Sequence, residues 1–266
     1  MGVKERHNIT FAGPPDAPAM LFAHGFGCDQ HMWRHVVPYF ADDYRIVLFD
    51  HAGAGRSDPA AYDPQRHASL GGYAEDVVTI CRELSLVDVI FVGHSVSSMI
   101  GVLAAAEAPE LFAALVLVGP SPRYLNDTGY VGGFDEPAIR ELLESLESNY
   151  LGWSSAMAPV IMGRPDRPEL GAELTESFCR TDPAIARQFA EVTFLSDNRA
   201  DLARARTPAL VLQCSADVIA PVSVGEYVRD HLPNAQYVQL QATGHCPNLS
   251  APEETAAAIR EFLRRR

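Results

Sequence analysis

Residues 89–101 read VIFVGHSVSSMIG, an apolar run that passes through small residues into a second apolar pattern. Residues 89–92 predict a strand buried on both faces, and the spacing of apolar residues after Ser95 predicts a helix. A serine at a sharp strand-to-helix turn is typical of an acyl-transfer nucleophile. The usual motif is G-x-S-x-G, and Ser97 stands where its last glycine would be. Since serine is still small enough for strand and helix to approach each other, Ser95 is predicted to be a nucleophile.

Other short apolar runs alternate with helical patterns along the chain, which predicts an α/β fold with a mostly parallel sheet and helices on both faces. The predicted strands are residues 20–23, 45–50, 89–93, 115–119, 209–213 and 237–240. Helices are expected at residues 70–86, after the serine, and from Pro252 to the C-terminus. Residues 122–200 lack strand patterns and are expected to form a helical lid, inserted into a core made of residues 1–121 and 201–266.

The residues that would complete a catalytic triad follow the last two predicted strands. A serine nucleophile needs a base, and the base needs an acid that orients it. The run ALVLQC leads to Asp217, and YVQLQ leads to His245 in a short Gly-His-Cys-Pro loop. Because the acid comes before the histidine in this kind of fold, Asp217 and His245 are the predicted partners of Ser95.

Two backbone N–H groups are expected to form the oxyanion hole, which stabilises the charge that develops on the substrate carbonyl. One belongs to Val96, at the N-terminus of the predicted helix. The other belongs to Phe26, in the loop His24-Gly25-Phe26-Gly27 after an early strand. A second glycine cluster, residues 50–58, does not fit G-x-G-x-x-G and is interpreted as a tight turn beneath the site.

A pocket for a small apolar substrate is expected under the lid. The residues predicted to line it are Phe26, His94, Tyr124, Phe134, Leu142, Trp153, Met157, Phe194 and Ile219, with Phe189 as a further inward-facing lid residue. No metal or cofactor is expected, since zinc-ligand spacings and phosphate-binding motifs are lacking from the sequence.

Composition narrows the class of partner. The formal net charge of −13 disfavours binding to nucleic acid and to anionic membranes, because the field of the molecule repels phosphate groups. The sequence has neither an apolar run long enough to cross a bilayer nor the apolar core of a secretion signal, so a cytoplasmic location is expected. The five cysteines show no CxxC pairing and are expected to be reduced and mostly buried.

Taken together, HGFG, GHSVS, Asp217 and His245 make the chain resemble the α/β-hydrolase superfamily over nearly its whole length. Several longer segments are similar to the RsbQ subfamily, bacterial hydrolases of stress signalling, and to the karrikin and strigolactone receptor hydrolases of plants. These segments are GFGCDQHMW, FDHAGAGRSD, GHSVSSMIGVLAA, GPSPRYLND, GGF, DPAIARQFA, SDNRADL and GHCP. In these relatives, serine in place of the last motif glycine is usual.

The resemblance implies the roles given above for Ser95, His245, Asp217, Phe26 and Val96, and a V-shaped lid of four helices over a closed apolar pocket. It also implies a butenolide-like ester or lactone as substrate and, for RsbQ-type proteins, a partner phosphatase. Two hypotheses stay open: a serine hydrolase of small esters or lactones, and a signalling receptor in which hydrolysis is slow or incidental. The same fold also supports hydroxynitrile lyases, cofactor-free haloperoxidases and C–C bond hydrolases, whereas dehalogenases and epoxide hydrolases would need Asp at the position of Ser95.

Overall fold

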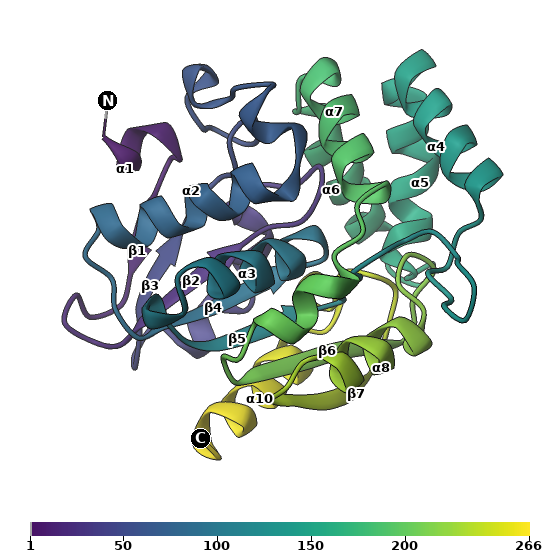
Figure 1. Cartoon of the computed structure of the whole chain (residues 1–266). Coiled ribbons are helices and arrows are strands. Elements are labelled where there is room, and N and C mark those ends of the chain that lie inside the picture. Colours follow the sequence, from purple (N-terminus) through teal and green to yellow (C-terminus); the bar gives the residue numbers. More distant parts are fainter. Residues whose placement is uncertain (1) are drawn as a thin grey trace.

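The computed structural model describes residues 2–266, which form one seven-stranded sheet in the order β1-β3-β2-β4-β5-β6-β7 (Figure 1). The strands are β1 (Thr10–Ala12), β2 (Ala19–Ala23), β3 (Arg45–Leu48), β4 (Val89–His94), β5 (Phe112–Val118), β6 (Ala209–Ala216) and β7 (Ala235–Thr243). Only β1 pairs in an antiparallel manner, with β3, and the other five pairings are parallel. The sheet is therefore mostly parallel, as predicted.

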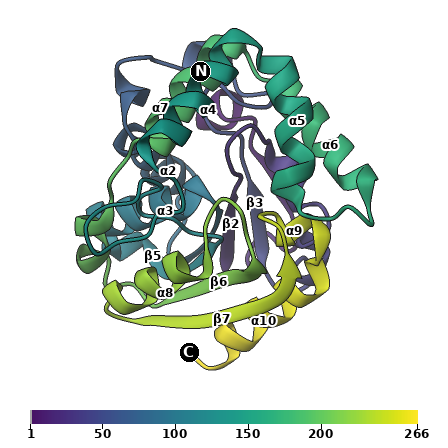
Figure 2. The same cartoon turned by 90° about the vertical axis from the view of Figure 1, so that its right-hand side faces the viewer.

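Helices cover both faces of this sheet, so the strands from β2 to β7 contribute side chains to two apolar cores. The core helices are α1 (Val3–Arg6), α2 (Leu70–Glu83), α3 (Val96–Glu107), α8 (Val222–His231), α9 (Pro247–Ser250) and α10 (Pro252–Arg264). Helices α2, α3 and α8 lie on one side of the sheet and α10 lies on the other (Figure 2). Phe91 packs in the core beneath α2, α3 and α8, whereas its neighbours Ile90 and Val92 pack in the core that contains α10. Burial on both faces explains why these strands are continuously apolar.

Four more helices are inserted between β5 and β6 and lie over the carboxyl ends of the strands (Figures 1 and 2). They are α4 (Glu136–Ser148), α5 (Tyr150–Met162), α6 (Pro168–Cys179) and α7 (Pro183–Phe194), called the cap helices below. Asp135, Asn149 and Asp182 begin three of them by accepting hydrogen bonds from backbone N–H groups of the first turn. The helical lid expected before the strand that leads to Asp217 is thus present, and its exact limits at 122 and 200 stay a prediction.

All six predicted strands are present, with ends that differ from the prediction by up to three residues. β1 was not predicted, because three residues at the sheet edge, two of them exposed, carry no clear alternation. The helix predicted over 70–86 ends at Glu83, where Leu84 leaves helical geometry and Ser85 takes a positive φ of 51°. Within residues 2–266, no helix has both the length and the apolar character needed to span a bilayer.

Candidate active site

Ser95 occupies the strand-to-helix turn between β4 and α3. Its backbone has φ 56° and ψ −123°, a conformation that costs a non-glycine residue about 1–3 kcal/mol and is held by its surroundings. Its N–H donates to the carbonyl of Val118 on β5 at 2.8 Å. A Cβ at Gly93 would come within 2.5 Å of the Ser97 carbonyl oxygen, so strand and helix meet most closely at that glycine. The turn therefore holds the Ser95 hydroxyl at the carboxyl end of the sheet.

The other two predicted triad residues meet Ser95 at this edge. His245 Nε2 lies 2.7 Å from Ser95 Oγ, and His245 Nδ1 lies 2.7 Å from Asp217 Oδ2. The side chains of Asp217 and His245 are buried, with 0% and 5% of their surface exposed. A neutral His245 with its proton on Nδ1 donates to Asp217 and can accept the Ser95 proton at Nε2, which is the arrangement that activates a serine for acyl transfer.

Backbone contacts fix both partners of the serine. The second carboxylate oxygen of Asp217 accepts from the N–H groups of Ile219 at 2.8 Å and Ala220 at 3.1 Å. His94 Nε2 donates to the His245 carbonyl at 2.7 Å, and burial, followed by the neighbouring His245, lowers the pKa of His94 to about 3. His94 is therefore neutral at ordinary pH and acts as a fixed donor.

The glycine loop after β2 lies directly against the turn that carries Ser95. A Cβ at Gly25 would come 2.5 Å from His94 Nδ1 and 3.4 Å from Ser95 Cβ. The next residue, Phe26, and Val96 at the first position of α3 bring their N–H groups to this region, and neither N–H donates to an acceptor among the described residues. Free N–H groups at a helix N-terminus favour negative charge, so the position suits an oxyanion.

Ser97 joins the glycine loop to α3 through a buried network. Its hydroxyl donates to the His24 carbonyl, and His51 Nε2 lies 2.7 Å from the same hydroxyl oxygen. The N–H of His51 donates to His24 Nε2 at 3.1 Å, and His24 Nδ1 lies 2.9 Å from the carbonyl of Gly25. Ser97 is therefore not only small enough for strand and helix to approach each other. Its hydroxyl also bonds to the loop that carries Phe26.

A narrow cavity of about 40 Å³ lies beside Ser95, beneath the cap helices. Six of the predicted pocket residues line it: Phe26, His94, Tyr124, Trp153, Phe194 and Ile219. The ring of Phe26 lies among four aromatic rings of the cap, with centroid distances of 5.8–6.3 Å. The aromatic wall suits a small apolar ligand.

Three predicted pocket residues do not line this cavity: Phe134, Leu142 and Met157. They pack in or against the apolar core that the cap shares with one face of the sheet, and the ring of Phe134 lies edge-on to that of Phe194, with centroids 6.2 Å apart. Helical spacing shows which face of a cap helix is apolar, but it does not show which apolar residues reach the ligand. A role for these three residues in the pocket therefore stays a prediction without support from the cavity lining.

Sequence reasoning missed other lining residues: Cys28, Ile161, Leu174, Phe178, Thr193 and Cys246. Cys28 and Cys246 lie within two residues of Phe26 and His245, so adjacency to the predicted site could have found them. The cap residues have no such signal, since their place depends on how the cap helices are oriented. Burial raises the pKa of the Cys28 thiol to about 12, so this thiol is protonated at the active site.

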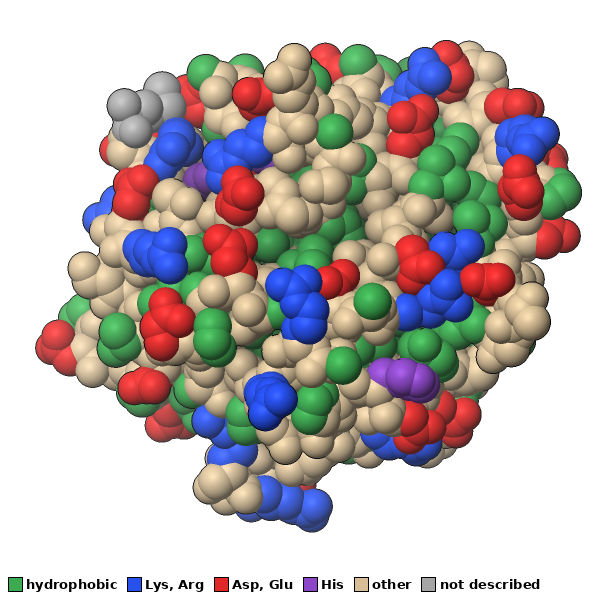
Figure 3. Space-filling view, viewed as in Figure 1, with side chains coloured by type: hydrophobic (Ala, Val, Ile, Leu, Met, Phe, Trp, Pro, Cys, Tyr) green, Lys and Arg blue, Asp and Glu red, His purple; other side chains and the backbone are tan. Residues whose placement is uncertain are grey.

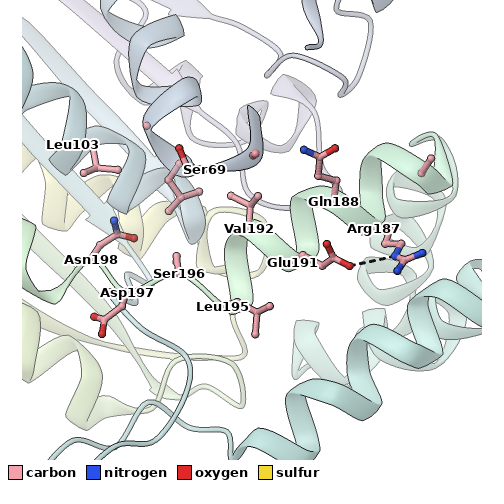
Figure 4. Close-up of a pocket in the computed structure, with 14 residues that line it drawn as sticks. Ser69, Leu103, Arg187, Gln188, Glu191, Val192, Leu195, Ser196, Asp197 and Asn198 are labelled. Atoms are coloured by element: carbon pink, nitrogen blue, oxygen red, sulfur yellow. Dashed lines mark hydrogen bonds and ion pairs between the residues drawn. The ribbon is translucent and has the colours of Figure 1, made fainter. Parts of the chain in front are cut away.

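An open groove runs along the outside of the cap, between α7 and the start of α2 (Figure 4). Its charged side chains pair with each other, as Arg187 Nε and Glu191 Oε1 do at 3.3 Å. None of the three residues Ser95, Asp217 and His245 lines this groove. The cavity at Ser95 is therefore the candidate active site.

Comparison with known families agrees with this geometry. A family model described as the alpha/beta hydrolase fold matches residues 18–252. The chain belongs to the α/β-hydrolase family. The matched span includes the glycine loop, the turn at Ser95, the cap helices and the loops that carry Asp217 and His245.

Plant receptor hydrolases are among the most similar relatives of this α/β-hydrolase. The chain is 41% identical to a probable esterase of Oryza sativa subsp. japonica, over 94% of this chain and 93% of the relative. It is 39% identical to a strigolactone esterase of Arabidopsis thaliana (99% and 98% covered) and 40% identical to the karrikin insensitive 2 receptor CA of Petunia hybrida (94% and 93% covered). The resemblance to karrikin and strigolactone receptor hydrolases is therefore confirmed.

Comparison with solved structures agrees with membership of the α/β-hydrolase family. A hydrolase from Oleispira antarctica superposes with a TM-score of 0.96 at 38% identity, covering 99% of this chain and 97% of the other. The fold extends to a bromoperoxidase from Bacillus anthracis, with a TM-score of 0.87 at 17% identity, 96% of this chain and 94% of the other being covered. The chain is an enzyme of the hydrolase type, and the more distant likeness shows the fold alone.

Proposed function

We propose that this α/β-hydrolase cleaves a small hydrophobic ester or lactone, with Ser95 as nucleophile, His245 as general base and Asp217 as orienting acid. The observation that carries the proposal is the pair of 2.7 Å contacts that join the three side chains beside an aromatic cavity. No residue of the proposed machinery requires a cofactor. The names of the relatives, among them a strigolactone esterase, favour a butenolide-like lactone within this substrate class.

The reaction would begin with transfer of the Ser95 proton to His245 Nε2 while Oγ attacks the substrate carbonyl. Asp217 stays ionised and stabilises the imidazolium that forms. The N–H groups of Phe26 and Val96 would stabilise the oxyanion, an effect worth about 3 kcal/mol for one donor. His245 then protonates the leaving oxygen, and a water activated by His245 hydrolyses the acyl-enzyme.

Hydrolysis of 4-nitrophenyl acetate by wild type and Ser95→Ala tests this proposal. We expect Ser95→Ala to reduce kcat by at least about 10⁴-fold, since removing a triad nucleophile has this order of effect. Ser155→Ala is the matched control, because Ser155 is exposed on α5 and bonds only to the Leu151 carbonyl. Phenylmethylsulfonyl fluoride should label Ser95 in wild type. The proposal would be overturned if Ser95→Ala kept full activity and if phenylmethylsulfonyl fluoride left Ser95 of the wild type unlabelled.

A receptor role is the second candidate function, and a contact between the cap and the triad favours it. The N–H of His245 donates to the carbonyl of Ile161 in α5 at 2.8 Å, so a ligand that moves the cap would also move the base. Relatives named karrikin insensitive 2 receptors support a ligand-dependent partner, here a phosphatase or another signalling protein in stress or small-molecule signalling. Affinity purification with and without a hydrolysed lactone separates the two, because a purely metabolic esterase retains no stoichiometric regulator.

Two further expectations belong to this proposal. Residues 122–200 would act as the lid, opening to admit the substrate. A cytoplasmic location fits the five free cysteines, four of them buried, because a reducing compartment keeps thiols free.

On the face seen in Figure 3, basic side chains are interspersed with acidic ones, in keeping with a small-molecule rather than a nucleic-acid ligand.

A further inference from the structure

Thr193, near the end of α7, has a hydroxyl that the fold does not use. The residue is 1% exposed and lines the cavity at Ser95, yet its Oγ1 has no hydrogen-bond partner among residues 2–266. Buried hydroxyls in folded proteins are almost always bonded, so each exception requires an explanation. The usual solution within a helix is donation to the carbonyl four residues back.

Other hydroxyls of the cap helices take that solution. Ser154, Ser155 and Thr175 donate to the carbonyls of Tyr150, Leu151 and Gly171 at 2.8–2.9 Å. Thr193 could donate to Phe189 in the same way and does not. The Thr193 hydroxyl therefore lies at the cavity without a hydrogen bond to its own helix.

A second hydroxyl, that of Tyr124, also borders this cavity. Its OH makes no hydrogen bond of standard geometry within the described chain, but it lies close enough to Ser95 for that side chain to lower the pKa of Tyr124 against the larger rise caused by burial. The Tyr124 hydroxyl therefore faces the nucleophile. Much of the remaining wall is aromatic or aliphatic. A free Thr193 hydroxyl in this apolar wall indicates a ligand that brings its own polar atom.

We propose that Thr193 forms a polar subsite for a second oxygen of the substrate, distinct from the carbonyl that Ser95 attacks. The substrate class is then an oxygenated apolar ester or lactone, in which a hydroxyl, ether or further carbonyl oxygen faces α7. A ligand lacking this oxygen leaves the Thr193 hydroxyl buried and unpaired, and a site built for a hydrogen bond discriminates strongly against such a ligand. This inference rests on the proposed hydrolase function.

The test compares substrates that differ by one oxygen. The probes are 4-propylphenyl acetate and 4-(2-hydroxyethyl)phenyl acetate, in which a terminal methyl is replaced by a hydroxyl, together with the corresponding 3-substituted pair. The ratio of kcat/KM within each pair is divided by the ratio of the uncatalysed rates. We expect wild type to prefer the hydroxylated member of at least one pair by about 10-fold or more.

Thr193→Val keeps the shape of the side chain and removes the hydroxyl, so the preference should fall to within about 2-fold while the propyl ester is hydrolysed as well as before. Thr193→Ser should retain the preference, and Ser155→Ala on the outer face of α5 should not change it. The subsite is refuted if wild type shows no preference in either pair, or if Thr193→Val keeps it. Ser95→Ala separates failure of the subsite from failure of the hydrolase proposal. Where Ser95→Ala abolishes turnover, the two results above refute the subsite alone. Activity that survives Ser95→Ala contradicts the hydrolase proposal itself.

Discussion

Replacing Ser97 by alanine tests whether the residue that departs from the common motif supports catalysis. The hydrogen bonds around it have one consistent assignment of protons. Burial lowers the pKa of His51 well below its usual value, so one ring nitrogen carries hydrogen. Because the Ser97 hydroxyl donates to the His24 carbonyl, His51 must donate from Nε2 to the Ser97 oxygen. Ser97 is therefore both donor and acceptor, and it is fully buried.

Ser97→Ala would leave the His24 carbonyl and the His51 Nε2–H without a partner. Each unpaired buried group costs about 1–3 kcal/mol, and partial relaxation reduces the sum, so we expect the free energy of unfolding to fall by roughly 2–4 kcal/mol. The His24 carbonyl lies two residues before Phe26, whose N–H is the proposed oxyanion donor. Since complete loss of one donor costs about 10²–10³ in kcat, a loop that is only loosened should cost about 10- to 100-fold.

Urea unfolding measures the first effect, and steady-state hydrolysis of 4-nitrophenyl acetate, well below the unfolding temperature, measures the second. KM should change by less than about 3-fold, because the loop contributes more to the transition state than to substrate binding. Thr255→Val is the control: Thr255 is fully buried in α10, donates to the Ala251 carbonyl and does not line the cavity at Ser95. It should keep kcat, even where the free energy of unfolding changes. If Ser97→Ala is destabilised but turns over at the wild-type rate, the hydroxyl supports the fold alone and the reasoning is wrong.

Three other outcomes follow from the site. Asp217→Asn should reduce kcat by about 10⁴-fold, because the base loses the carboxylate that orients it. Steady-state kinetics measure this effect, and a loss below about 10-fold would contradict the assignment. Because burial lowers the folded-state pKa of His94 to about 3 from an ordinary value of 6.5, unfolding takes up a proton between these limits. The free energy of unfolding should thus be highest above pH 6.5 and fall as the pH approaches 3. In urea titrations, the free energy of unfolding of His94→Gln should depend less steeply on pH in this range. In native protein, iodoacetamide should alkylate the exposed Cys179 before the four buried thiols, and mass spectrometry that found equal labelling of all five would refute this.

The sequence carried enough information to predict the sheet and the proposed triad because both depend on local patterns. A buried parallel strand must be apolar at every position, and the chemistry follows directly after the strands, at Ser95, Asp217 and His245. The edge strand β1 was not predictable in this way, since only three residues pair and two of them are exposed. Local patterns therefore specify the central layers of the fold better than its edge.

Pocket residues from the cap were predictable only in part, for a physical reason. Phe134, Leu142 and Met157 satisfy the same apolar pattern as Trp153 and Phe194, and all five pack in one core. Which of them reaches the ligand depends on the rotation of each helix, and that rotation is set by contacts with other helices. Thr193 shows the opposite case, since a polar residue on an apolar face gave no reason to expect it in the cavity.

The glycine before His245 shows how the cap and the core constrain each other. A Cβ at Gly244 would come 1.9 Å from the Met162 carbonyl oxygen, and a Cβ at Gly163 would come 2.6 Å from Gly244 Cα. Both glycines have positive φ, 61° for Gly163 and 82° for Gly244, so the end of α5 and the loop of the proposed base touch backbone to backbone. Read from the sequence, Gly244 belongs to a short catalytic loop. In the structure it is also the point where the cap rests on that loop, so a shift of α5 cannot leave the position of His245 unchanged.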